Sequence, residues 1–309
     1  MSLLYSVKEA SKATNFNYET FVFAAGSDER ALAMLRILGE RENRISKVLL
    51  LKYDSFDEKS VLESLPAAEV IPICINDDAS SFLMYLQNNE DAFHEKSILI
   101  DITSIRIPEM FMILKYLTLL NLSVNLEVSY STPVEYEFEG EPFTSYHSYY
   151  GNLKTTDLVG FGGMSEDMSH SQMIIFLGFE GILSAKVNED IKYDRLTLVN
   201  NLPSFYEKYK DISMINNYDL LTTRHEKLVY VPANNPFETF NFLSEQLNEN
   251  ESACIAPLST KPVALGVCLY ALAHDNIRVV YPVADEYNHH RANSVHNTYL
   301  YEIPLNAVN

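Results

Sequence analysis

Short, continuous hydrophobic runs alternate along this chain with stretches of helical periodicity. The run FVFAA at 21–25 lacks the every-second-residue alternation of a strand that has one face in water. Continuous apolar runs of this kind are typical of strands that are buried on both faces of a parallel sheet. Strands that alternate with helices imply right-handed crossovers. The pattern therefore predicts α/β domains with mostly parallel, doubly wound sheets.

Segments in the first half of the chain recur in the second half at nearly one offset. FVFAAGSDERALAML matches IIFLGFEGILSAKV, with Gly26 on Gly178 at an offset of 152 residues. ILIDITSIRIPEMF matches CIAPLSTKPVALG, and VSYSTPVEY matches VVYPVADEY with Tyr130 on Tyr281, an offset of 151. A shared offset between separate segments indicates internal duplication. We therefore expect two tandem Rossmann-like domains, at 1–145 and 172–309.

The joint between the two copies is expected at 146–171. This segment is rich in Gly, Ser and Thr and has no strong periodicity. Its glycines at 160, 162 and 163 are not framed by a strand before and a helix after, so they are no dinucleotide fingerprint. We interpret the segment as a linker or covering loop, with a loop that closes over a ligand as the alternative.

Composition fits this organisation and narrows the classes of partner. The chain has 309 residues, 47% of them hydrophobic, enough for about two domains of ~150 residues with cores of their own. A net charge of −19 repels polyanions, so long nucleic acid is not an expected partner. A small anion remains a possible ligand, because a few correctly oriented hydrogen-bond donors are enough to bind it.

The remaining sequence signals concern compartment, cofactors and metals. Three cysteines without disulfide or CxxC spacing indicate a reducing, cytoplasmic environment. We expect no signal peptide, no membrane span and no cofactor. His289 and His290 are adjacent, and adjacent side chains on a strand point to opposite faces, so no metal site is expected. The polar segment around them is interpreted as a domain edge, or as a ligand-contacting loop with Tyr287, Asn288 and Arg291.

The candidate ligand site is the set of turns that follow the predicted strands. In open parallel sheets, ligands bind beyond the carboxyl ends of the strands, where helix N-termini supply N–H donors. Glycines would allow close backbone approach, and hydroxyl and amide groups would bind the ligand. The residues expected there are Gly26, Ser27, Asn76, Thr103 and Ser104 in the first half, and Gly178, Asn234, Ser259, Thr260, Lys261 and Tyr287 in the second half.

Lys261 stands between a predicted strand and a predicted helix. A cation at the N-terminus of a helix is disfavoured by the macrodipole, so its position is easier to explain if it contacts an anion. The alternative is that Ser259 or Thr260 only caps the helix while Lys261 points to solvent. Both interpretations remain open at this point.

The segment APLSTKPVALG resembles the turn that CARF proteins, the Rossmann-like sensor domains linked to CRISPR defence, place after a strand and before an apolar helix. DITSIRIPEMF is similar to a degenerate copy of that turn. Leu258 and Ser259 stand where the family pattern has Gly-Gly. The resemblance implies a two-fold arrangement of two domains around one cyclic oligoadenylate, which a duplicated chain would make internally.

Three functions are compatible with these features. The leading hypothesis is a binding or sensor module for a small nucleotide-like anion, with a role in prokaryotic defence and a possible protein partner. The second is a hydrolase of a phosphodiester or N-glycosidic bond, in which Lys261 stabilises charge and Glu180 or a histidine acts as base. The third is a non-catalytic scaffold subunit of a defence complex.

Overall fold

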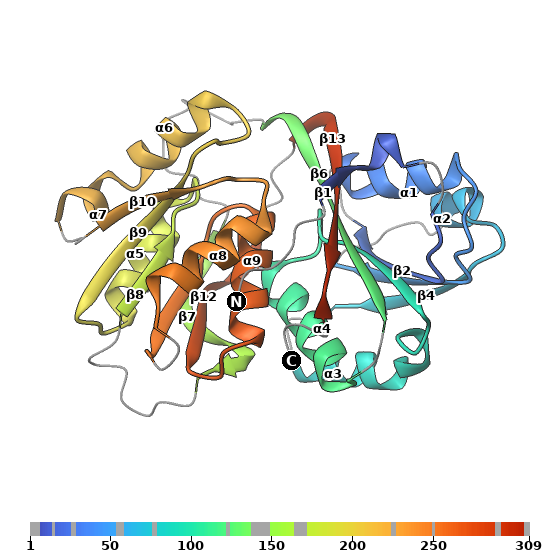
Figure 1. Cartoon of the computed structure of the whole chain (residues 1–309), viewed down its shortest axis with the longest axis horizontal. Coiled ribbons are helices and arrows are strands. Elements are labelled where there is room, and N and C mark those ends of the chain that lie inside the picture. Colours follow the sequence, from blue (N-terminus) through green and yellow to red (C-terminus); the bar gives the residue numbers. More distant parts are fainter. Residues whose placement is uncertain are drawn as a thin grey trace. The chain divides into compact units, whose positions relative to one another are not determined.

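The computed structural model describes residues 7–13, 16–25, 29–53, 59–75, 79–121, 124–136, 149–163, 172–223, 227–248, 251–287 and 292–305. The chain divides into two compact units (Figure 1). The first unit comprises 5–137 with 290–309, and the second unit comprises 138–289 with 1–4. Each unit contains one mostly parallel sheet with helices, so the predicted α/β class with two Rossmann-like domains is confirmed.

The sheet of the first unit has seven strands in the order β1-β13-β6-β5-β2-β3-β4. Its central strands pair in parallel, and β13 pairs antiparallel with β6 and with β1. The strands are β1 (Val7–Glu9), β2 (Thr20–Ala25), β3 (Lys47–Lys52), β4 (Glu69–Cys74), β5 (Ser97–Asp101), β6 (Asn125–Tyr136) and β13 (Ala292–Ile303). The helices are η1 (Ala10–Lys12), η2 (Glu29–Leu32), α1 (Ala33–Gly39), α2 (Lys59–Ser64), α3 (Ala79–Asn88), η3 (Glu90–Ala92) and α4 (Ile107–Leu119).

The sheet of the second unit has six strands in the order β10-β9-β8-β11-β12-β7. All its pairs are parallel except that between β12 and β7. The strands are β7 (Tyr149–Gly162), β8 (Gln172–Phe176), β9 (Arg195–Asn201), β10 (Lys227–Val231), β11 (Ala253–Pro257) and β12 (Ile277–Tyr287). The helices are α5 (Gly181–Asp190), α6 (Glu207–Asn216), α7 (Tyr218–Thr223), α8 (Pro236–Gln246) and α9 (Lys261–Leu272).

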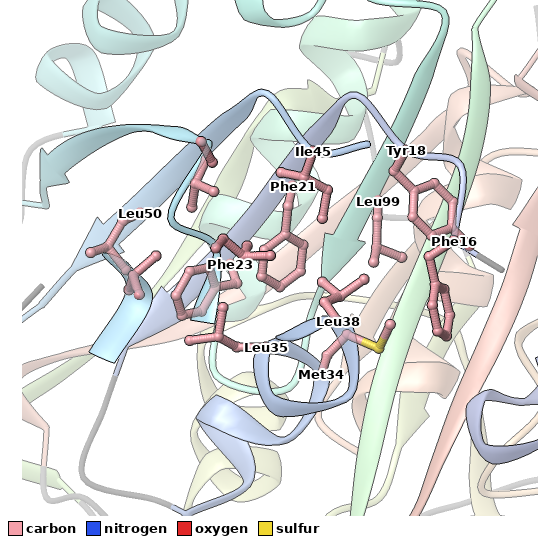
Figure 2. Packing of buried hydrophobic residues seen from close by; sticks show 14 of the residues in the cluster. Phe16, Tyr18, Phe21, Phe23, Met34, Leu35, Leu38, Ile45, Leu50 and Leu99 are labelled. Carbon is pink, nitrogen blue, oxygen red and sulfur yellow. The ribbon is translucent and has the colours of Figure 1, made fainter. Parts of the chain in front are cut away.

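The core of the first unit explains its continuous hydrophobic runs. Successive side chains of a strand point to opposite faces of the sheet. Phe21 and Phe23 of β2 point to one face, where they pack near Leu35 of α1 (Figure 2). Val22 and Ala24 alternate with them and are buried as well. Both faces of β2 are therefore covered, which requires apolar residues at every position and removes the alternation.

In each sheet, the strand that pairs antiparallel with the last parallel strand comes from the other half of the duplicated sequence. Strand β7 follows β6 in the chain but pairs with β12, whereas β13 follows β12 but pairs with β6. Each thus lies beside the last parallel strand of its sheet, at the same place in the strand order. The two halves exchange these strands reciprocally.

This exchange corrects the expected domain boundaries. Residues 149–162, expected inside a linker, form a 14-residue strand of the second unit. Residues 292–303, expected in the second domain, form a strand of the first unit. Local periodicity does not reveal such pairings, because β7 is an edge strand with mostly polar or exposed positions, and its partner lies more than a hundred residues away in sequence.

Candidate ligand site at the carboxyl edge of the second sheet

The parallel strands β8 to β11 bring their carboxyl ends to one edge of the second sheet. From β8 the strand order runs outward to β9 and β10, and the chain then crosses to β11 on the other side of β8. This reversal makes a switch point between β8 and β11, the place where open α/β sheets bind ligands. The turns that flank it are 177–180 after β8 and 258–260 after β11.

Two hydroxyl groups hold the turn after β11 in place. Ser259 Oγ donates to Asn201 Oδ1 at the end of β9, at 2.6 Å. Thr260 Oγ1 donates to the carbonyl of Ala233 after β10, at 2.6 Å, and accepts from Val263 N as the N-cap of α9. A hydroxyl has one proton to donate, so neither is a ligand donor in this arrangement. Both position the turn, and the capping interpretation of Thr260 is confirmed.

Lys261 is presented on this fixed turn. It is the first residue of α9, its side chain is half-buried, and the rest of that 12-residue helix is buried. Pro262 follows at the second helical position, where a missing N–H costs little. The turn beneath the lysine is already ordered, and the helix end beside it carries a partial positive charge. The local field therefore favours an anion next to this side chain.

Gly178 faces the neighbouring turn at its Cα. A Cβ at this position would lie 2.1 Å from the carbonyl oxygen of Leu258 and 3.9 Å from Ser259 Cα. The Gly178 carbonyl accepts hydrogen bonds from Ser213 Oγ at 3.0 Å and from Asn217 Nδ2 at 2.9 Å. The predicted close approach exists, but the approaching backbone is the chain's own Leu258. Packing between the two turns thus explains why glycine stands here.

Asn201 and three aromatic rings at this edge are functional candidates that were missed in the sequence. Asn201 is the last residue of β9, and a polar side chain at the carboxyl end of a predicted strand was the available signal. Phe179 follows β8 and Tyr206 precedes α6, and both are half-buried. Their rings contact the buried ring of Tyr209, with centroids at 5.2 and 5.3 Å. An aromatic residue in a strand-end turn was the signal for this cluster.

The turn after β5 in the first unit is built from different contacts. Thr103 is 4% exposed. Its backbone N–H and its hydroxyl both donate to Asp101 Oδ1, and its Oγ1 accepts from Ser131 N at 2.9 Å. Arg106 N donates to Tyr53 OH at 2.9 Å, and the Arg106 guanidinium lies 4.2 Å from the centre of the Tyr53 ring. Thr103 therefore ties β5 to β6, and its role in ligand binding stays a prediction.

A buried network lies beside this turn in the first unit. Arg30 is 8% exposed, donates to the Ser131 carbonyl at 3.4 Å and lies 5.3 Å from the centre of the Tyr136 ring. Burial raises the pKa of Tyr130 well above its usual range, and nearby Tyr136 raises it further. Tyr130 is therefore a neutral phenol at pH 7. With so little of Arg30 exposed, this network serves the interior of the unit.

The other predicted site residues fall into three groups. Ser104, Asn234 and Glu180 are half-buried in turns at the expected edges, and Glu180 immediately precedes α5. Tyr287 ends β12, where it pairs with Tyr149, and its side chain is outside the described part of the structure. The residues that lie outside the described ranges altogether are Gly26, Ser27, Asn76, Asn288, His289, His290 and Arg291.

In the described part of the chain, no group of three or more His, Cys, Asp or Glu side chains is placed to hold a metal ion. No helix of that part is both long and apolar enough to cross a membrane.

Comparison with known proteins adds little to this geometry. No family model matches the chain, and no curated protein matches it. Among solved structures, the chain is similar to a universal stress protein from Archaeoglobus fulgidus DSM 4304, with 8% sequence identity, a TM-score of 0.24, and coverage of 84% of this chain and 94% of that chain. A likeness at this level carries no information on ligand or activity.

Proposed function

We propose that the chain binds a small nucleotide-like anion at the carboxyl edge of the second sheet, with Lys261 as the cationic contact. One observation carries this proposal: Lys261 begins α9 beside the switch point, on a turn that Ser259 and Thr260 already hold. A contact group on an ordered base loses less conformational entropy when the ligand binds. The N-terminus of α9 adds its partial positive charge to that of the lysine.

The distribution of acidic residues favours the second unit over the first. The segments that link strand ends to helices in the second unit, 177–180, 202–206, 232–235 and 258–261, contain a single acidic residue, Glu180. The corresponding segments of the first unit contain six, namely Asp28, Asp54, Asp57, Glu58, Asp77 and Asp78. In a chain with a net charge of −19, we expect an anion to meet less repulsion beside the connecting segments whose sequences hold fewer carboxylates.

The resemblance of the segment at 256–266 to the CARF turn suggests which ligands to test first. Cyclic oligoadenylates belong in the screen beside mono- and dinucleotides. A sensor role in prokaryotic defence, acting through a protein partner, is part of the proposal. The same samples, assayed for ligand breakdown, test the hydrolase alternative.

A thermal-shift screen of the purified chain with these nucleotides tests the proposal. A ligand at 100 times its Kd stabilises the folded state by about 2.7 kcal/mol, which is an easily measured shift. Lys261→Ala should reduce that shift strongly, and Lys261→Arg should retain part of it. The matched control is Lys192→Ala, which removes the same charge from an exposed position that precedes β9, at the opposite edge of the sheet.

Two results would overturn the proposal. One is the absence of a shift with every nucleotide in the screen. The other is a shift that Lys261→Ala and Lys192→Ala reduce equally, because net charge alone would then explain the binding. In either case the scaffold hypothesis becomes the better account of the chain.

A further inference from the structure

We infer that Phe179 and Tyr206 form a stacking subsite for the aromatic base of the ligand, so that the ligand class is nucleotides and not simple phosphates or carboxylates. The inference rests on the proposed function, because it concerns the other end of the same ligand. The inference adds Phe179 and Tyr206, which are not among the site residues predicted from the sequence.

The two rings share one buried support. Tyr209 of α6 is 3% exposed, and its ring contacts both of them. The Phe179 ring meets the Tyr209 ring at an interplanar angle of 65°, and the Tyr206 ring meets it at 79°. Edge-to-face contacts of this kind are favourable and fix the orientation of each ring. Phe179 and Tyr206 are thus held by their packing.

Hydrogen bonds fix the backbone that carries Phe179. Its carbonyl accepts from Asn216 Nδ2 at 2.6 Å. The preceding carbonyl, that of Gly178, accepts from Ser213 Oγ and Asn217 Nδ2 at 3.0 and 2.9 Å. The turn after β8 therefore has little freedom to withdraw the ring. A ligand that stacks on a preorganised ring loses less entropy than one that must order it.

The exposure of these rings distinguishes them from the aromatic core. Phe176, which ends β8 only three residues before Phe179, is fully buried. Phe179 and Tyr206 are half-buried, so each residue is partly exposed to solvent. Every nucleobase has a π-face, and stacking on an aromatic side chain tolerates any base. The pair is suited to a base and offers little to a ligand without a ring.

Phe179 and Lys261 lie on two turns that contact each other. A Cβ on Gly178 would be 3.9 Å from Ser259 Cα, so the turns after β8 and β11 are in contact there. Phe179 is one residue from that contact, and Lys261 is two residues from it. One and two Cα–Cα steps span at most about 3.8 and 7.6 Å. The inference therefore places the phosphate at the lysine and the base at Phe179, on the two neighbouring turns.

Two probes that share a phosphate and a ribose separate the contribution of the base to the affinity from that of the phosphate and the ribose. We would measure Kd for AMP and for ribose 5-phosphate by isothermal titration calorimetry. The wild-type chain should bind AMP about 5- to 100-fold more tightly, as expected for one stacked base. Phe179→Leu should remove most of that advantage and leave the affinity for ribose 5-phosphate unchanged. Phe179→Tyr should restore it, and Tyr206→Leu should reduce it.

The controls identify which idea fails. Tyr218→Leu removes a 64%-exposed aromatic side chain at the start of α7 and should change neither affinity. Equal affinity of the wild type for the two probes overturns the base subsite, and so does an equal loss for both in Phe179→Leu. Lys261→Ala should weaken both probes to the same extent. If neither AMP nor ribose 5-phosphate binds, or if Lys261→Ala changes the affinity for neither, the result contradicts the proposed function itself.

Discussion

The substitution Gly178→Ala separates a packing role from a ligand-approach role for this glycine. The new Cβ would lie 2.1 Å from the carbonyl oxygen of Leu258 and 3.1 Å from its carbonyl carbon. Real Cβ contacts under 3.0 Å essentially do not occur, so one of the two turns must move by roughly 1 Å. The Leu258 turn resists this movement, because Leu258 N donates to the Phe176 carbonyl at 3.1 Å and Ser259 is held by Asn201.

The expected loss of stability follows from two opposing effects. Overpacking in a well-packed site costs about 1–3 kcal/mol. Replacing glycine by alanine also restricts the unfolded chain, which offsets about 0.4–1 kcal/mol. We therefore expect Gly178→Ala to lower the free energy of unfolding by about 1–2 kcal/mol.

Urea denaturation followed by far-UV circular dichroism measures this change. With an m-value of about 2 kcal/mol/M, the midpoint should fall by about 0.5–1 M. Gly162→Ala is the matched control, since the nearest atom to its Cβ is Asp157 Oδ2 at 4.0 Å, and it should be neutral or slightly stabilising. Equal midpoints for the two variants, with nucleotide binding lost only in Gly178→Ala, would refute the packing argument and restore the ligand-approach interpretation.

Two further predictions concern titratable groups. Burial raises the pKa of the Cys254 thiol to about 12, and Cys268 is also buried, whereas Cys74 is exposed. A thiol reagent at pH 8 should therefore modify Cys74 rapidly, and the other two cysteines only after denaturation. A fast phase of modification that persists in Cys74→Ser would contradict this prediction. Burial raises the pKa of Glu127 above its usual value of 4.5, so the stability that its protonated form contributes is present below pH 4.5 and is lost as the pH rises through the folded-state pKa. Glu127→Gln, which can still accept the hydrogen bond from Tyr18, should gain thermal stability relative to the wild type between pH 4 and pH 7; a constant difference across that range would contradict the assignment.

Most of the sheet interior could be predicted from local sequence. The runs that form β2, β3, β5, β8 and β11 are continuous and apolar because both faces of these strands are covered. Helix α9 could be predicted to begin near Pro262, because proline is suited to the first turn of a helix. These features can be predicted locally, because each depends on only a few consecutive residues.

The candidate site was predictable only in its location. Strand-end turns identified the edge and Lys261, but several predicted ligand donors turned out to bind their own chain. Ser259 and Thr260 hold the turn, and Gly178 accommodates Leu258. Which acceptor a hydroxyl meets depends on neighbouring turns that are distant in sequence, so composition and spacing do not decide it.

The sequence by itself determined the α/β class and the duplication, because strands buried on both faces and repeated segments can be recognised directly in the sequence. The edge at which a ligand binds stays a prediction. The tertiary structure decided the exchange of β7 and β13, since neither antiparallel strand has a continuous apolar run that identifies its partner. It also decided that Phe179 and Tyr206 meet around Tyr209. Both outcomes depend on contacts between residues far apart in sequence, so no short segment of the chain reveals them.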